Sequence, residues 1–204
     1  NVPERHRTMR AVFDHSWKLL SVEEQQVLRR LSIFRGSFTR AAATPVAEAS
    51  LWVLAALVDK SLLWRNGEGR YYLHERIRQY AYRKLHDSGE AEPIHDRHLM
   101  AYLAVAEAAQ AHLYGADYAA VCTELDTVHE NLRAALAWGL QVAPSDLAQS
   151  QVQQRVLAGA RLAGALSRFW HLQGYLHEGR AHLLAALQLL RARPSATAVQ
   201  PVLA

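Results

Sequence analysis

The chain has 204 residues, half of them hydrophobic, which is enough for one or two packed domains rich in Ala and Leu helices. Its single cysteine, Cys122, excludes an internal disulfide and fits a reducing compartment. No run of about 18 apolar residues occurs, so we expect no membrane-spanning helix and a cytoplasmic location. Because the sequence begins Asn1-Val2-Pro3, we also expect it to be part of a longer protein.

Charge is unevenly distributed along the chain. Residues 1–86 hold 15 Lys and Arg against 8 Asp and Glu, a balance of +7, whereas residues 87–204 hold 8 against 11, a balance of −3. A basic first half indicates either nucleic-acid binding or arginines that pair with acids on helix surfaces. No basic cluster alternates with aromatic residues as single-strand binding requires, and this favours the paired arginines.

The first part of the chain predicts short helices with local capping signals. An apolar stripe from Met9 to Leu20 predicts the first helix. Residues 21–24 spell a capping box, in which Ser21 and Glu24 satisfy each other's backbone amides, and a second helix should follow. Thr39 and Ser50 are each placed to cap a further helix. We expect the helix from Ser50 to turn its leucines inward, including Leu51.

A β-hairpin is predicted next. Residues 61–64 and 71–73 are apolar runs on either side of Asn66-Gly67-Glu68-Gly69, and Asn-Gly favours the tight turn of a hairpin. A helix should begin at about Glu75. Short helices followed by a hairpin outline a winged helix, which we predict for residues 1–88.

Beyond Gly89 the pattern changes to long helices rich in Ala and Leu. We predict helices over 94–113, 152–172 and 175–192, and a continuous apolar spacing from Tyr118 to Leu136. A polar loop is expected from Ala143 to about Ser150. The predicted fold class is therefore mainly α, a winged helix with a small β-hairpin followed by an all-helical array.

The last helix pair resembles a tetratricopeptide (TPR) hairpin. Its large and small residues alternate in the order Trp170, Gly174, Tyr175, Gly179, Leu183 and Ala186. We therefore predict a TPR-like repeat domain over residues 89–204, as the start of a longer array.

Catalytic motifs are missing from the sequence. No Gly-rich phosphate loop of the G-x-x-x-x-G-K-[ST] type occurs, and no Ser or Cys lies in a recognisable nucleophile motif. His95 and His98 would share a helix face, but no third ligand accompanies them, so we predict no metal site and two solvent-facing histidines. The chain itself is predicted not to be an enzyme.

The string DKSLL…RYYLHERIRQYA resembles the winged-helix segment of signal-transduction ATPases with numerous domains (the STAND class, with an NB-ARC-like nucleotide-binding domain). Leu73-His74-Glu75 occupies the place of that class's Met-His-Asp motif. The opening RTMRAVFDHSWKLLSVEEQQVLRRLSIFRGSFT is similar to the same domain of its bacterial transcriptional regulators. LDTVHENLRAALAWGL and RFWHLQGYLHEGRAHLLAAL are similar to the helical repeats that follow it there.

This resemblance implies a function. His74 would sense the terminal phosphate of ADP, and the winged helix would clamp an ADP-bound nucleotide-binding domain of the same chain. The fragment would then be a non-catalytic regulatory arm without a cofactor of its own, while the full-length protein would bind ADP or ATP and form an oligomer on activation. The helical repeats would sense a ligand or protein, with Trp138, Trp170 and Tyr175 as candidate contacts or, alternatively, as core residues.

The alternative function is an autonomous DNA-binding winged-helix transcription factor with a helical dimerisation or effector domain. Such a protein should carry Arg and Lys on the helix before the wing. The segment 50–59 contains neither residue type, and only Arg65 and Arg70 flank the predicted turn. The sequence therefore favours the regulatory arm, and direct DNA binding is not expected.

Overall fold

The computed structural model describes residues 13–142 and 149–192, which are mainly helical. The described residues divide into two compact units, one of residues 13–102 and 124–134 and the other of residues 103–123, 135–142 and 149–192. Helices α6, α7 and α8 contribute residues to both units. The predicted fold class, a helical domain with a small hairpin followed by a helical array, is confirmed. The predicted domain boundary at residues 88 and 89 stays a prediction.

Capping signals set the helices of the first unit. After a helical stretch over 13–18, α2 covers Val22–Leu31 and begins at Ser21, whose hydroxyl accepts from the backbone N–H of Glu24 while the Glu24 carboxylate accepts from that of Ser21. This is the predicted capping box. The N-cap residues of the next two helices are also as predicted. Helix α3 covers Arg40–Ala47 behind Thr39, and α4 covers Leu51–Asp59 behind Ser50.

The hairpin is present and shorter than predicted. Strands β1 (Trp64–Arg65) and β2 (Tyr71–Tyr72) are antiparallel, with Trp64 opposite Tyr72 and Arg65 opposite Tyr71. Ser61 adopts a φ of 57° and donates its N–H to the Val58 carbonyl at 2.8 Å, so the segment before β1 is a turn. Phe38 extends the sheet by one bridge, in which its backbone N–H and C=O bond Tyr71 at 2.9 and 2.8 Å.

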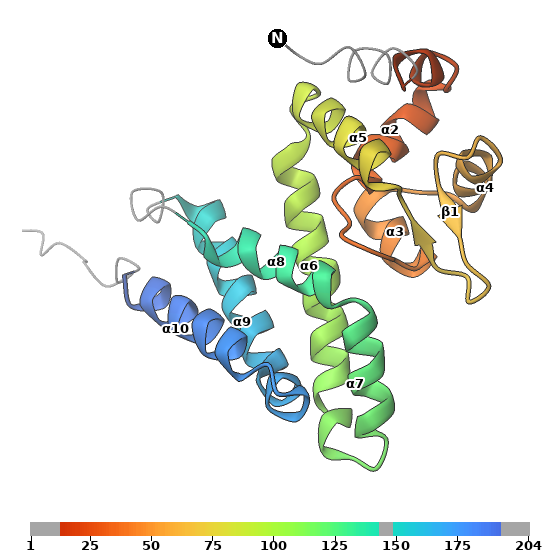
Figure 1. The fold of residues 1–204 in the computed structure, drawn as a ribbon. Helices are drawn as coiled ribbons and strands as arrows, with labels where there is room; N and C mark the ends of the chain where they lie inside the picture. The colour runs from red at the N-terminus through yellow and green to blue at the C-terminus, as the bar shows by residue number, and fades with distance from the viewer. Residues whose placement is uncertain (1–12, 143–148, 193–204) are drawn as a thin grey trace, which may run out of the picture. The chain divides into compact units, whose positions relative to one another are not determined.

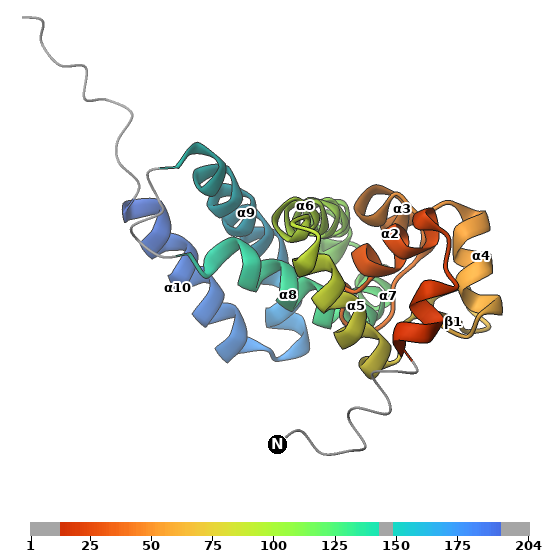
Figure 2. The same cartoon turned by 90° about the horizontal axis from the view of Figure 1, so that it is seen from above.

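The first unit closes around α2, which contacts α3, α4 and α5 (Figures 1 and 2). Helix α5 covers Glu75–Asp87 and leads to α6, Ala91–Gln110. The Phe34 and Phe38 rings stack at 4.3 Å in the centre. The other fully buried apolar side chains of this core include Leu28, Leu31, Leu54, Leu57, Leu63, Leu85 and Ile94.

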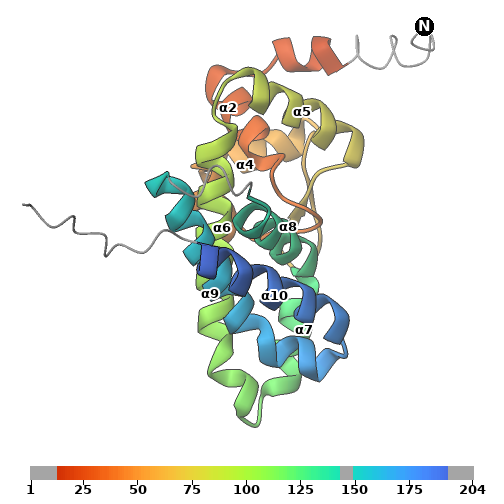
Figure 3. The same cartoon turned by 90° about the vertical axis from the view of Figure 1, so that its left-hand side faces the viewer.

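The second unit is built from helices alone within the part of the chain that the structure describes. A short 3-10 helix, η1 (His112–Tyr114), precedes α7 (Tyr118–Thr127) and α8 (His129–Leu140). Helices α9 (Ser150–Gln173) and α10 (Leu176–Ala192) lie side by side and are joined at Gly174, whose φ is +77° (Figures 1 and 3). They form a helical hairpin.

The apolar spacing from Tyr118 to Leu136 belongs to two helices rather than one. The break falls at Val128, whose N–H bonds the carbonyl of Leu125 at 3.2 Å, three residues earlier. The apolar spacing continues across the break because each of the two helices buries apolar side chains at helical spacing. The predicted polar loop after Ala143 falls largely on 143–148, and Met9 on the N-terminal segment, outside the described residues.

Two glycines let α8 and α9 touch through their backbones. A Cβ atom on Gly159 would lie 2.9 Å from the Cα of Gly139 and 2.9 Å from its carbonyl carbon. A side chain at position 159 would therefore force the two helices apart.

Among the described residues, no single helix is long and apolar enough to cross a membrane. Helices α3 and α4 reach that length and composition only as a pair, and they are bent by 105°.

Candidate functional site

Helices α3 and α4 form a helix-turn-helix. Their axes differ in direction by 105°, and three residues, Glu48 to Ser50, join them. These values agree with the crossing of about 90–120° and the short turn of DNA-binding helix pairs. The hairpin follows α4 directly, which places it as the wing.

The turn of this motif is fixed by an ion-pair network. Glu48 ends α3 with a φ of 57°, a left-handed conformation that costs a non-glycine residue roughly 1–2 kcal/mol. Its carboxylate pairs with Arg30 of α2 and, at 2.8 Å, with Arg97 of α6. Arg30 also bonds Glu90 at 2.8 Å, and Arg29 bonds the same carboxylate at 2.9 Å. Arg30 of α2 and Arg97 of α6 thus hold the turn, and Glu90 and Arg29 extend the network behind Arg30.

The pKa values in this network follow from the arginines. The hydrogen bond from Arg30 lowers the pKa of Glu48, and the hydrogen bond from Arg30 lowers the pKa of Glu90 to about 2. Both carboxylates are therefore ionised at neutral pH, as their pairing requires.

The wing turn is organised by one asparagine. The side-chain oxygen of Asn66 accepts the backbone N–H groups of Glu68 at 3.1 Å and Arg70 at 2.9 Å. Arg70 is anchored in turn, because its Nε donates to the Ser37 hydroxyl at 2.9 Å. Arg65 lies exposed on β1, and the outer face of the hairpin carries the stacked rings of Trp64 and Tyr72, 6.2 Å apart.

The exposed side of α4 is apolar rather than basic. Trp52 is 84% exposed and Leu51 is 50% exposed, both in the first turn of the helix. The prediction that Leu51 turns inward is wrong, because the buried face of α4 is formed by Val53, Leu54 and Leu57. Lys60, just after the helix, bonds Glu24 at 2.6 Å. Positive charge near α4 therefore comes from Arg40, exposed at the start of α3, and from the wing.

His74 caps a helix. It is the N-cap residue of α5, and its Nδ1 accepts the backbone N–H of Arg76 at 3.4 Å. The neighbouring Glu75 is bonded by Arg78 at 2.7 Å, which lowers the pKa of Glu75 to about 2. The predicted contact of His74 with a nucleotide phosphate stays a prediction.

The two other histidines singled out from sequence have different surroundings. His95 lies with its Nε2 3.1 Å from the Tyr82 hydroxyl. His98 is 1% exposed, so the prediction that it faces solvent is wrong. Its Nε2–H donates to the side-chain oxygen of Asn131 at 3.3 Å, and burial lowers the pKa of His98 to about 3. The imidazole is therefore neutral at physiological pH.

Asn131 was missed by the sequence reasoning. It is fully buried in α8, accepts the Arg35 backbone N–H at 2.8 Å, and donates to the Ser37 carbonyl at 3.0 Å. Together with the His98 contact, these bonds tie α6 and α8 to the loop that precedes the helix-turn-helix. No local sequence pattern signals them, since the partners are 33 to 96 residues away along the chain.

The three aromatic residues predicted to sense a partner lie in different environments of the second unit. Trp170 is 2% exposed and stacks on His182 at 5.7 Å, as a core residue would. Tyr175 is half-buried with its ring 5.8 Å from that of Phe169, and Trp138 is half-buried beneath the Arg155 guanidinium at 4.0 Å. Their sensing role stays a prediction.

Comparison with known proteins relates the chain to transcriptional regulators. It is 35% identical over 211 residues to Rv0890c of Mycobacterium tuberculosis and to Mb0914c of Mycobacterium bovis, whose names describe them as proposed HTH-type (helix-turn-helix) transcriptional regulators. Each match covers 93% of this chain and 22% of the relative. Rv0894 of M. tuberculosis, an uncharacterised protein, is 35% identical over 105 residues, covering 46% of this chain and 27% of that protein.

The chain thus spans about a fifth of the length of the curated regulators that it matches. No protein-family model matches the chain. No solved structure matches it.

These relatives correct the main functional prediction. Proteins named for a helix-turn-helix and for transcriptional regulation agree with the alternative, a DNA-binding winged helix with a helical domain. The predicted non-catalytic arm of a nucleotide-switched ATPase is therefore wrong. The resemblance to that class supplied the correct architecture, but the same architecture serves different functions.

Proposed function

We propose that this chain is the DNA-binding part of a transcriptional regulator, with its helical array as the effector or dimerisation domain. One observation carries the proposal: a helix pair bent by 105° over a three-residue turn, followed by a wing, occurs in a chain 35% identical to proposed HTH-type regulators.

The exposed residues on these elements define how DNA would be contacted. In helix-turn-helix proteins the first residues of the second helix meet base edges. Here those residues are Leu51 and Trp52, which suit apolar contacts with thymine methyl groups rather than bidentate hydrogen bonds to guanine. On either side of α4, Arg40 of α3 and Arg65 of β1 supply positive charge that would contact DNA phosphates.

A protein of this kind should bind duplex DNA with a shallow salt dependence. If two or three phosphates are neutralised, the logarithm of the binding constant should fall with the logarithm of salt concentration with a slope of about −2 to −3. Binding by this chain alone should consequently be weak at physiological salt.

The test is fluorescence anisotropy of a random-sequence 25-base-pair duplex titrated with the 204-residue chain at several salt concentrations. Arg65→Glu should weaken binding and make the salt dependence shallower, reducing the magnitude of the slope by about one or more. Trp52→Ala should weaken binding without changing the slope. Arg191→Glu is the matched control, because Arg191 is an exposed arginine on α10 in the other unit. Equal effects of Arg65→Glu and Arg191→Glu, or no salt-dependent binding by the wild type, would contradict the proposal.

A further inference from the structure

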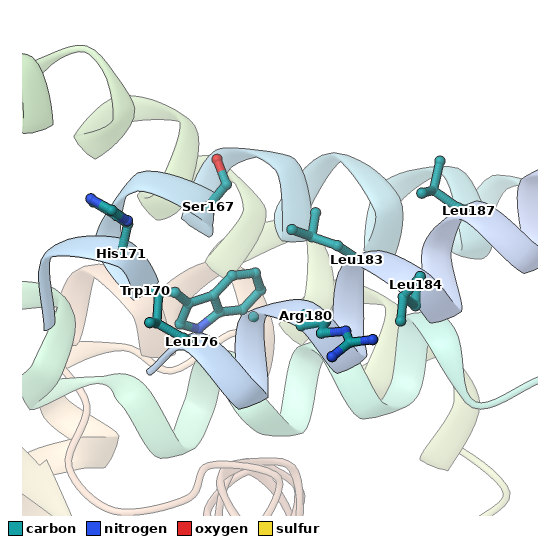
Figure 4. A pocket seen from close by; sticks show the side chains of 9 residues that line it. Ser167, Trp170, His171, Leu176, Arg180, Leu183, Leu184 and Leu187 are labelled. Carbon is teal, nitrogen blue, oxygen red and sulfur yellow. The ribbon is translucent and has the colours of Figure 1, made fainter. Parts of the chain in front are cut away.

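The α9–α10 hairpin carries an apolar groove with a volume of about 380 Å³. Its α10 wall is formed by Leu176, Arg180, Leu183, Leu184 and Leu187. The end of α9 supplies the opposite wall, with Ser167 and His171, and the ring of Trp170 between them (Figure 4).

The depth of the groove depends on Gly179. A Cβ atom at this position would lie 2.8 Å from Cε3 of Trp170. Because glycine has no side chain, the indole ring of Trp170 packs directly against the α10 backbone and forms the floor. The sequence pattern of alternating large and small residues included Trp170, Gly179 and Leu183, but not Leu184 or Leu187.

The leucines of the wall are unusually exposed for their size. Leu176 is 57% exposed, Leu184 is 46% exposed and Leu187 is 49% exposed. They recur along one side of α10 between positions 176 and 187, and these 11 steps along the helix correspond to about 16 Å at a rise of 1.5 Å per residue. An apolar stripe three turns long beside a second helix is the shape that receives an amphipathic helix.

Charge argues against a second copy of the same groove as the occupant. Arg180 is the one Arg, Lys, Asp or Glu among the described residues that line the groove, and it forms no ion pair or hydrogen bond with another described residue. A second copy of this groove would bring a second arginine and no carboxylate. A helix with a carboxylate beside its apolar stripe would instead complement Arg180.

We propose that the α9–α10 groove binds an amphipathic helix of a partner protein, with leucine-like side chains against Leu184 and Leu187 and an acidic side chain against Arg180. This site is independent of the DNA contacts proposed above. It gives the helical array a partner of defined chemistry.

The probe is a displayed library of 18-residue helices with Leu, Ile, Met or Phe on one face and Glu, Ala or Lys at the flanking positions. Selection against the 204-residue chain should yield helices that share a Glu at one flanking position. Arg180→Glu should weaken their binding at least tenfold. A peptide in which that Glu is replaced by Lys should regain part of the affinity for the Arg180→Glu variant. Leu187→Glu should also abolish binding.

Leu157→Glu provides the matched control, because Leu157 is 44% exposed on α9 and does not line the groove. All substituted positions are exposed or half-exposed, and circular dichroism verifies that each variant is folded. The proposal is overturned if no helix is selected, or if the selected helices bind the Arg180→Glu variant as they bind the wild type. A wild-type dimer in light scattering that Leu187→Glu converts to a monomer would overturn it in favour of a second copy.

Discussion

Acidification from pH 7.5 to 5 should destabilise the protein through one buried histidine. His98 has a pKa of about 3 in the folded chain against an ordinary value of 6.5. Burial is the main cause of this low pKa. The hydrogen bond with Asn131 raises the pKa in part, and the charges of His95 and Arg35 lower it further. The unfolded chain therefore binds a proton at this site between pH 6.5 and 3 that the folded chain does not bind. Stability must fall as the pH falls through this window.

The size of the effect follows from the two pKa values. At pH 5 the unfolded state gains roughly 2 kcal/mol relative to the folded state, and near pH 3 the loss reaches about 4 kcal/mol. The carboxylates with lowered pKa, such as Glu75 and Glu90, have ordinary values of 4.5. Their contribution is lost mainly below pH 4.5, so these carboxylates contribute little between pH 7.5 and 5.

Urea unfolding of the wild type and of His98→Gln at pH 7.5 and 5 measures this effect. The glutamine amide can still donate to Asn131 and does not titrate, so the variant should lose about 2 kcal/mol less than the wild type between the two pH values. Equal losses for the two proteins would refute the assignment of a neutral, buried His98.

Three further substitutions should change stability in defined directions. Gly179→Ala should cost about 1–3 kcal/mol in urea unfolding, because the new methyl group would collide with Trp170. Gly164→Ala is the control: nothing lies near its Cβ position, so the substitution should be neutral or stabilising by up to about 1 kcal/mol. Trp170→Ala should cost roughly 3–5 kcal/mol, and a loss below 1 kcal/mol would show that Trp170 is not a core residue. Ser21→Ala should lower the thermal midpoint by removing the N-cap of α2, worth about 1 kcal/mol, and Ser21→Thr should retain most of that stability.

Local signals in the sequence were sufficient for much of the fold. Ser21, Thr39 and Ser50 cap the helices that follow them because a capping side chain needs only a backbone amide two or three residues away. The Asn66-Gly67 pair correctly predicted the hairpin, although the positive φ of its turn falls on Gly69 and Asn66 acts through its side-chain oxygen. The break at Val128 was missed, since apolar spacing is the same for one helix as for two helices with a common buried side.

The candidate sites depend on contacts that are distant in sequence. The 105° bend between α3 and α4 is fixed by Glu48, which meets Arg30 and Arg97 across 18 and 49 residues. Asn131 and the buried state of His98 likewise arise only when α6, α8 and the loop around Arg35 come together. The function was missed at a different step, because resemblance to a class of domains does not identify what the domain contacts.

The contact between Gly139 and Gly159 limits how this protein can vary. At most core positions a larger residue can be accommodated when its neighbour becomes smaller, so that volume is exchanged between the two. Both partners here are already glycine, and a Cβ on Gly159 would meet main-chain atoms that no substitution removes. We therefore expect that no substitution at position 139 would compensate for a larger residue at position 159. A redesigned array would have to keep glycine at position 159 or space α8 and α9 anew.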